Sequence, residues 1–204
     1  MVFGFSFVTL VLLIAFILIA MSVHEAMHAY VALRLGDRLA AEQGRISLNP
    51  LKHVDPLMTV LLPAVTLILF HVPFLAARPV PFNPERVRFN EFGAALIAVA
   101  GPVSNLLLAI VAATLLHIVS PGSFVVQALG LFVALNVTLF VFNLVPVPPL
   151  DGSRVLYAFA PETVQDFLSK IEPYGLLIIF ALIFVGHFGD VLLALNNSVL
   201  SLLL

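Results

Sequence analysis

Two histidines and a glutamate lie within one short stretch, HEAMH, at residues 24–28. Residues four apart share one face of a helix, so the imidazoles of His24 and His28 could bind a single metal ion. Glu25 follows His24 by one position and could reach the reacting water without being a ligand. This spacing of residue types suits metal-assisted hydrolysis, with Glu25 as the general base.

The same three side chains could instead be isolated polar residues in a helix bundle. They follow an almost unbroken apolar run over residues 5–21, so they are expected at membrane depth. A charged or polar group there costs about 2.5–3.5 kcal/mol. A bound divalent cation would compensate for that cost, which favours a metal site.

Two histidines do not complete a catalytic metal site, because zinc hydrolases typically use three protein ligands. The chain has no Cys, so the third ligand must be His, Asp or Glu. Asp151 is the only acidic residue between Glu91 and Glu162, and it follows the end of an apolar segment. Asp-Gly after prolines would by itself indicate a turn. Together with HEAMH, Asp151 is the candidate third ligand.

The residues around Asp151 support that choice. Three prolines precede it and forbid a regular helix, and Gly152 permits a close backbone approach. The other histidines lack partner spacing and are expected to be interfacial or hydrogen-bonded: His53, His71, His117 and His187.

The composition is that of an integral membrane protein. Of 204 residues, 62% are hydrophobic and only 10% are charged, against about 25% charged in a soluble domain. A net charge of −2 without a basic run excludes a nucleic-acid partner. The N-terminal apolar run is too long for a typical signal peptide and no Lys or Arg precedes it, so we expect a retained transmembrane helix.

Four segments are long enough to span about 30 Å of hydrocarbon. They cover about residues 4–33, 92–119, 124–145 and 174–203. A fifth apolar stretch, 57–77, contains Pro63 and an HVP interruption, which fit a bent or re-entrant hairpin.

Charge and ligand geometry give the same topology. If the stretch 57–77 returns to the side it left, all nine Lys and Arg lie on the cytoplasmic side. The first span leaves the membrane soon after His28. The next two spans, 92–119 and 124–145, form a hairpin, so the chain leaves the hairpin on the side of the membrane where it entered. Asp151 can then meet the histidines only if that hairpin starts on the cytoplasmic side.

Three motifs resemble those of the site-2 protease family of intramembrane zinc metalloproteases. They are HEAMH at 24–28, GPVSN at 101–105 and NLVPVPPLDG at 143–152. The resemblance covers about residues 15–160 and is to the compact members that lack a PDZ domain. HEAMH lies close to the start of the sequence, which leaves the total number of spans open.

The resemblance implies one zinc ion bound by His24, His28 and Asp151, with Glu25 as the base. It also implies proteolysis of a transmembrane substrate within the bilayer, and it implies that Asn143 holds the substrate backbone or the developing oxyanion. Gly101, Pro102 and Asn105 are interpreted as a helix-packing motif rather than as catalytic residues.

The predicted fold is an all-α polytopic membrane protein, a helical bundle of about four to six membrane segments. It includes a re-entrant element and short cytoplasmic-side β-strands, with RISLN at 45–49 as an edge strand for the substrate and 80–82 as its neighbour. We expect a single domain over 1–204, with a core of about 15–160 and a C-terminal membrane segment of about 173–204.

The expected location is the plasma membrane of a prokaryote, with the active site toward the cytoplasm. Two other classes stay open: a membrane ion or metal transporter, and an inactive protease-like binding partner. A transporter would favour several polar positions along a path, whereas here they gather at one depth. The sequence leaves the oligomeric state, the natural substrate and the identity of the divalent metal undetermined.

Overall fold

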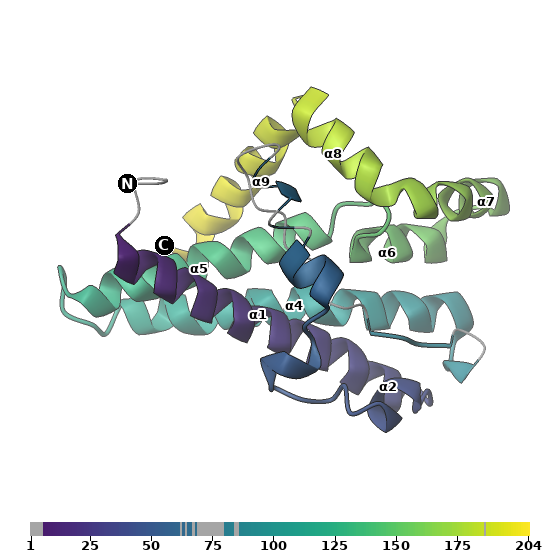
Figure 1. The fold of residues 1–204 in the computed structure, drawn as a ribbon, viewed down its shortest axis with the longest axis horizontal. Coiled ribbons are helices and arrows are strands. Elements are labelled where there is room, and N and C mark those ends of the chain that lie inside the picture. Colours follow the sequence, from purple (N-terminus) through teal and green to yellow (C-terminus); the bar gives the residue numbers. More distant parts are fainter. Residues whose placement is uncertain are drawn as a thin grey trace.

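Helices make up the regular structure of this computed structural model, which describes residues 6–61, 63, 65, 66, 68, 80–83, 86–185 and 187–204 (Figure 1). The longer helices are α1 (Phe7–Arg34), α4 (Asn90–Leu116), α5 (Phe124–Asn143), α6 (Asp151–Phe159), α7 (Glu162–Ile171), α8 (Gly175–Val185) and α9 (Phe188–Leu203). Shorter elements are α2 (Leu39–Glu42), η1 (Pro50–Lys52), η2 (Pro56–Leu61) and η4 (Glu172–Tyr174).

Serine side chains cap the N-termini of two long helices, α1 and α5. The Ser6 hydroxyl accepts a hydrogen bond from the Thr9 amide at 3.1 Å, and Ser123 does the same for Val126 at 3.4 Å. Each bond satisfies a backbone N–H that has no partner within the helix. The SPGS turn therefore ends one apolar segment and starts the next.

Three helices are long and apolar enough to cross a membrane: α1, α4 and α5. The C-terminal helices form a broken pair bent by 85°, which could be a fourth crossing. The described residues therefore contain three such helices, or four spans if the broken pair counts as one, and they do not support the predicted range of up to six segments. The predicted C-terminal segment is divided because HFG at 187–189 interrupts the apolar run and α9 begins anew at Phe188.

Helix α4 is the centre of the bundle, because α1, α5 and α6 all pack against it. Figure 1 shows α1 lying across the α4–α5 pair, with α6 and α7 at the end of the molecule away from both termini. Helix α9 packs back on α5. This arrangement brings α1 and α6, which are far apart in the sequence, against the same helix.

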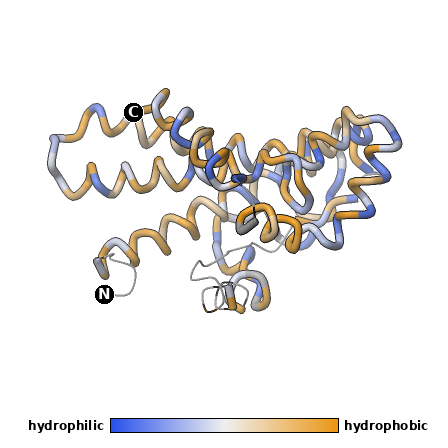
Figure 2. The backbone as a smooth tube through the Cα atoms, turned by 90° about the horizontal axis from the view of Figure 1, so that it is seen from above, coloured by the Kyte–Doolittle hydropathy of each residue, from blue (hydrophilic) through white to orange (hydrophobic). Residues whose placement is uncertain are grey.

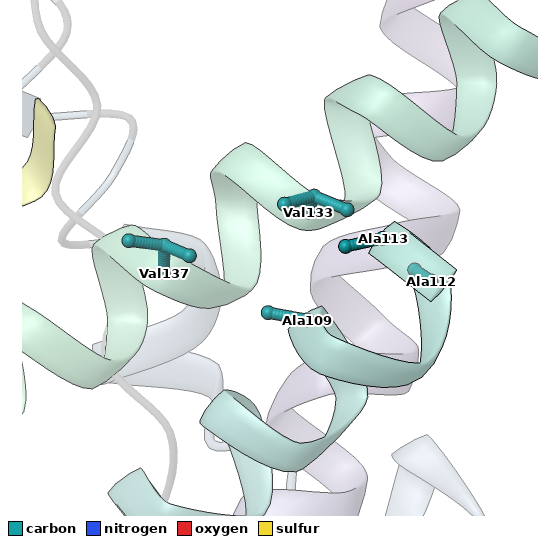
Figure 3. Close-up of a cluster of buried hydrophobic side chains, with 5 residues drawn as sticks. All are labelled: Ala109, Ala112, Ala113, Val133 and Val137. Carbon is teal, nitrogen blue, oxygen red and sulfur yellow. The ribbon is translucent and has the colours of Figure 1, made fainter. Parts of the chain in front are cut away.

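Small residues let α4 and α5 approach closely. Three buried alanines of α4 face two fully buried valines of α5 (Figure 3); they are Ala109, Ala112, Ala113, Val133 and Val137. Apolar side chains gain little by leaving lipid, so membrane helices associate through close packing of this kind. This close contact between α4 and α5 helps to fix the position of the α4 residues that precede it.

Hydropathy is distributed unevenly along the molecule. In Figure 2 the tube of α1 is mostly hydrophobic near the N-terminus, and strongly hydrophilic stretches are most frequent at the opposite end. Such polarity is typical of a bundle whose connections reach water mainly on one side.

The predicted strands at 45–49 and 80–82 were wrong, because the described residues of both segments are irregular. Local hydrogen bonds explain the first segment. The Asn49 amide donates to the Ser47 hydroxyl and the Leu51 amide donates to the Asn49 side chain, at 3.1 Å each. Such bonds compete with a strand ladder. In the second segment Pro81 has no N–H to donate to a ladder.

Much of the predicted re-entrant stretch 57–77 lies outside the described residues. Its first part belongs to η2, which is a π-helix over Pro56–Leu61.

Candidate metal centre

Both histidines of HEAMH lie on the buried face of α1. His24 and His28 are each 7% exposed, and Glu25 is 8% exposed. The two imidazole rings meet edge to face with their centroids 4.6 Å apart. The four-residue spacing therefore places both rings at one point between α1 and α4, as helix geometry requires.

Each imidazole is oriented by an oxygen of α4. His24 Nδ1 lies 2.6 Å from Oδ1 of Asn105, and His28 Nδ1 lies 2.7 Å from the carbonyl oxygen of Ile97. Both oxygens are acceptors, so each Nδ1 carries the proton and donates it. With Nδ1 protonated, each Nε2 would be the nitrogen that binds an ion, which is the tautomer that a metal ligand needs.

The Asp151 carboxylate completes the cluster. Its Oδ2 lies 3.2 Å from Nε2 of His24 and 3.4 Å from Nε2 of His28. A tetrahedral zinc ion with ligand bonds of about 2.1 Å holds its ligand atoms about 3.4 Å apart. The structure thus brings the three predicted ligands together, with potential ligand atoms within 4.8 Å of one another.

The end of α5 determines where Asp151 lies. Helix α5 ends at Asn143, the proline-rich turn follows, and α6 begins at Asp151 itself. A Cβ atom on Gly152 would collide with the carbonyl oxygen of Leu144 and lie 2.6 Å from that of Val145. The first turn of α6 therefore packs directly on the last turn of α5, which aims the Asp151 side chain at α1.

Asp151 is suited to bind a cation. Burial raises the pKa of its carboxyl group, but positive charge on the facing imidazoles of His28 and His24 outweighs burial and holds the pKa below its usual range. A bound cation would supply that positive charge with both imidazoles neutral. The carboxylate is therefore ionised, as a metal ligand must be.

Gly101 leaves room for an ion beside the histidines. A Cβ atom on this residue would lie 2.5 Å from Nε2 of His24 and equally close against Nε2 of His28. That position is close to where an ion bound to both nitrogens must lie. Two neutral imidazoles, one carboxylate and a space that a methyl group would fill fit a divalent cation with borderline ligand preferences.

Glu25 lies within electrostatic range of both histidines and of Asp151. It projects from α1 one residue after His24, beside the cluster of three potential ligands. Asn143 is positioned differently, because its amide donates to the Leu139 carbonyl of its own helix at 2.9 Å.

The other described histidines are not among the possible ligands of the cluster. His53 is buried, and its Nε2 lies 2.7 Å from the carbonyl oxygen of Ser47. His187 pairs with Asp190 at 3.2 Å on the exposed surface. His117 caps the end of α4, and His71 lies outside the described residues.

Sequence reasoning missed the contribution of GPVSN to this site. Gly101 and Asn105 were interpreted only as helix-packing residues, yet both contact the histidines. A fully buried Asn in an apolar helix must find polar partners, and that requirement was the available signal.

Comparison with known proteins supports the same assignment. The sequence model of peptidase family M50 matches residues 120–186. The Bacillus subtilis protein named "Putative zinc metalloprotease YwhC" is 35% identical over 190 residues, which cover 89% of this chain and 83% of that protein. The chain belongs to peptidase family M50.

Other relatives are less similar in sequence or match a shorter part of the chain. The zinc metalloprotease Rip2 of Mycolicibacterium smegmatis, also named as putative, is 29% identical over 178 residues, covering 85% of this chain and 66% of Rip2. The Methanocaldococcus jannaschii protein MJ0611 is 36% identical over 91 residues, covering 44% of this chain and 46% of that protein. No solved structure matches the chain. The resemblance to the site-2 proteases, the M50 family, is thereby confirmed.

Proposed function

We propose that this M50 peptidase is an intramembrane zinc metalloprotease that hydrolyses peptide bonds in or near transmembrane segments of membrane proteins. The observation that carries the proposal is the convergence of His24, His28 and Asp151 on one buried point of an apolar helix bundle. The metalloprotease names of YwhC and Rip2 support the choice of zinc.

His24, His28 and Asp151 would hold the ion. Zinc bound there supplies a Lewis acid that lowers the pKa of water and polarises a carbonyl group. The fixed hydrogen bonds of both Nδ1 atoms keep the imidazoles aimed at the ion, so little reorganisation is needed on binding. The small exposed fraction of the cluster keeps other water away from the reacting groups.

Glu25 is the proposed general base. Its place next to His24 on α1 puts the carboxylate at the edge of the ligand cluster without making it a ligand. It would take a proton from the attacking water and return it to the leaving amine, a role worth about 10²–10⁴ in rate.

The substrate is proposed to be a transmembrane protein or peptide. A helix in lipid hides its carbonyl groups in hydrogen bonds, so the scissile segment must unwind before it reaches the site. Asn143 is the candidate to hold the unwound backbone or the developing oxyanion. Its amide nitrogen carries two N–H groups and one of them donates to Leu139, so the other would donate to the substrate.

We further propose that residues 1–204 form one membrane-embedded domain. It would lie in the cell membrane of a prokaryote with the metal site toward the cytoplasm, where the positive-inside rule places the basic connections. The relatives come from Bacillus subtilis, Mycolicibacterium smegmatis and Methanocaldococcus jannaschii, all of them prokaryotes, which agrees with this location.

A cleavage assay with matched zinc analysis tests the proposal. The wild-type protein and Glu25→Gln are purified in detergent, and each is assayed for bound zinc and for cleavage of a transmembrane peptide. We expect both proteins to bind one zinc ion per chain and only the wild type to cleave. Glu91→Gln, which removes the charge of an exposed carboxylate in the first turn of α4, is the matched control and should cleave normally.

Cleavage by Glu25→Gln at the wild-type rate would refute the role of Glu25. A wild-type protein that binds no zinc would refute the metalloprotease. Zinc binding without cleavage, accompanied by metal flux into vesicles, would favour the transporter instead.

A further inference from the structure

Two asparagines are fully buried where α4 and α5 face each other. Asn105 of α4 and Asn136 of α5 are both 0% exposed. A buried amide without hydrogen bonds is costly in a protein interior, and no water is available in the hydrocarbon to replace them. Their placement therefore calls for specific partners, and the partners form a chain that ends at the metal centre.

The chain of hydrogen bonds has a fixed direction. The Asn136 amide nitrogen donates to the Phe132 carbonyl oxygen at 2.9 Å, and that oxygen can only accept. Asn136 must therefore present its own Oδ1 to Asn105, whose amide nitrogen donates to it at 3.0 Å. Asn105 is left with Oδ1 facing His24, and Nδ1 of His24 donates to it across 2.6 Å.

We propose that Asn136 is a positioning residue of the metal centre, which acts through Asn105 to hold His24 in the tautomer that leaves Nε2 free. This inference rests on the proposed metalloprotease function and assigns a role to a residue outside the three sequence motifs. Asn136 hydrogen-bonds to Asn105, and Asn105 in turn accepts from His24, so the effect of Asn136 on His24 passes through the Asn105 amide.

Without Asn136, the Asn105 amide nitrogen would lose its acceptor, and the orientation of the side-chain amide would no longer be fixed. The second contact of the amide nitrogen, to the Ala20 carbonyl, is long at 3.4 Å. Asn105 could then rotate and present its N–H₂ group to His24. Nδ1 would become the acceptor, the proton would move to Nε2, and Nε2 could no longer bind the ion.

His28 provides an internal comparison. Its Nδ1 donates directly to the backbone carbonyl of Ile97, which cannot rotate as a side-chain amide can. Asn136 should therefore affect the tautomer of His24 and leave that of His28 unchanged.

A double-mutant cycle on zinc affinity tests the inference. The zinc dissociation constant is measured by chelator competition for the wild type, Asn136→Leu, Asn105→Leu and the double variant. We expect about a ten-fold loss for Asn136→Leu and a loss of about 10–100-fold for Asn105→Leu, as for groups that orient metal ligands. The double variant should bind zinc as weakly as Asn105→Leu alone, because the Asn136 effect needs Asn105. Independent, additive losses would overturn the proposal.

A rescue variant and a matched control sharpen the cycle. Asn136→Asp keeps an oxygen acceptor for Asn105, and its protonated carboxyl can donate to Phe132, so zinc affinity should recover relative to Asn136→Leu. Thr138→Val removes a comparable bond to the preceding turn of α5, from the Thr138 hydroxyl to Ala134 at 2.8 Å, on the exposed side. It should leave zinc affinity unchanged.

The Nδ1 proton is read from the ¹H and ¹⁵N shifts of labelled histidine in the zinc-loaded protein. We expect hydrogen-bonded Nδ1–H signals from both residues in the wild type, and loss of that signal only at His24 in Asn136→Leu. If that variant does not fold, Asn136→Ala is used in the same cycle. A wild-type protein that cleaves and binds zinc, with an unchanged His24 tautomer in the Asn136 variants, overturns this inference alone. A wild type that binds no zinc overturns the proposed function as well.

Discussion

Gly101 of α4 lies directly against His24 of α1, so closely that a Cβ atom on the glycine would be 2.5 Å from the imidazole Nε2. We predict that Gly101→Ala abolishes zinc binding, because its methyl group occupies the space between the ligand nitrogens. The zinc dissociation constant, measured by chelator competition, should rise by about a hundred-fold or more. Peptide cleavage should be lost in parallel.

Gly130→Ala is the control for this substitution. Gly130 lies within α5, and a Cβ atom there meets nothing within 4 Å. Alanine has the higher helix propensity, by about 1 kcal/mol, so this variant should fold and bind zinc as the wild type does. If Gly101→Ala retained wild-type zinc affinity, the ion could not lie where we place it.

Gly152 helps to position Asp151, because its lack of a side chain lets the start of α6 pack closely on Leu144 and Val145. We predict that Gly152→Ala pushes α6 away from the carbonyl oxygens of Leu144 and Val145, and with it the third ligand. Overpacking of this kind costs about 1–3 kcal/mol of stability. The measurements are thermal unfolding and zinc affinity, and both should fall. Gly189→Ala, where a Cβ atom also meets open space, should lower neither; a normal Gly152→Ala protein would contradict the close approach.

Zinc should stabilise the folded protein through these three ligands. An ion that binds only the folded state, at 100 times its dissociation constant, adds about 2.7 kcal/mol. We therefore expect a chelator to lower the unfolding temperature and added zinc to restore it in the wild type. Asp151→Asn should show neither shift. Magnesium should not replace zinc, because it prefers octahedral oxygen ligands; equal stabilisation by magnesium would count against the ligand set.

Most of the reaction centre was predictable because helix periodicity and membrane energetics act locally. The four-residue spacing of His24 and His28 places both on one face of the helix. Asp151 is the only acidic residue between Glu91 and Glu162, and because a buried charge is costly, a ligand role best explained its presence there. The apolar runs that became α1, α4 and α5 were visible for the same reason.

The parts that escaped prediction depend on tertiary contacts. Nothing in the local sequence shows that Gly101 faces Nε2 of His24 or that Asn105 accepts from Nδ1, because both facts follow from how α4 crosses α1. For the segment 45–49 the sequence predicted a strand that the structure does not contain. Its alternating pattern resembled a strand, but Ser47 and Asn49 bond to neighbouring amides and turn the chain instead.

Asp37 joins the connection after α1 to the segment that leads into α4. This carboxylate is fully buried and accepts hydrogen bonds from the Leu39 amide at 3.0 Å and from the Asn83 amide at 2.6 Å. We predict that Asp37→Ala lowers the free energy of unfolding by about 1–3 kcal/mol for each amide left without a partner in this partly buried turn. Thermal unfolding in detergent measures the loss.

The site of the damage separates this role from one in metal binding. The substitution should speed amide hydrogen exchange at Asn83, because its N–H loses the Asp37 acceptor, while zinc affinity of the folded protein stays within about two-fold. Asp190→Ala removes an exposed carboxylate that pairs with exposed His187, and such pairs contribute about 0–1 kcal/mol. If Asp37→Ala were no more destabilised than Asp190→Ala, the buried carboxylate would not be what holds the two connections together.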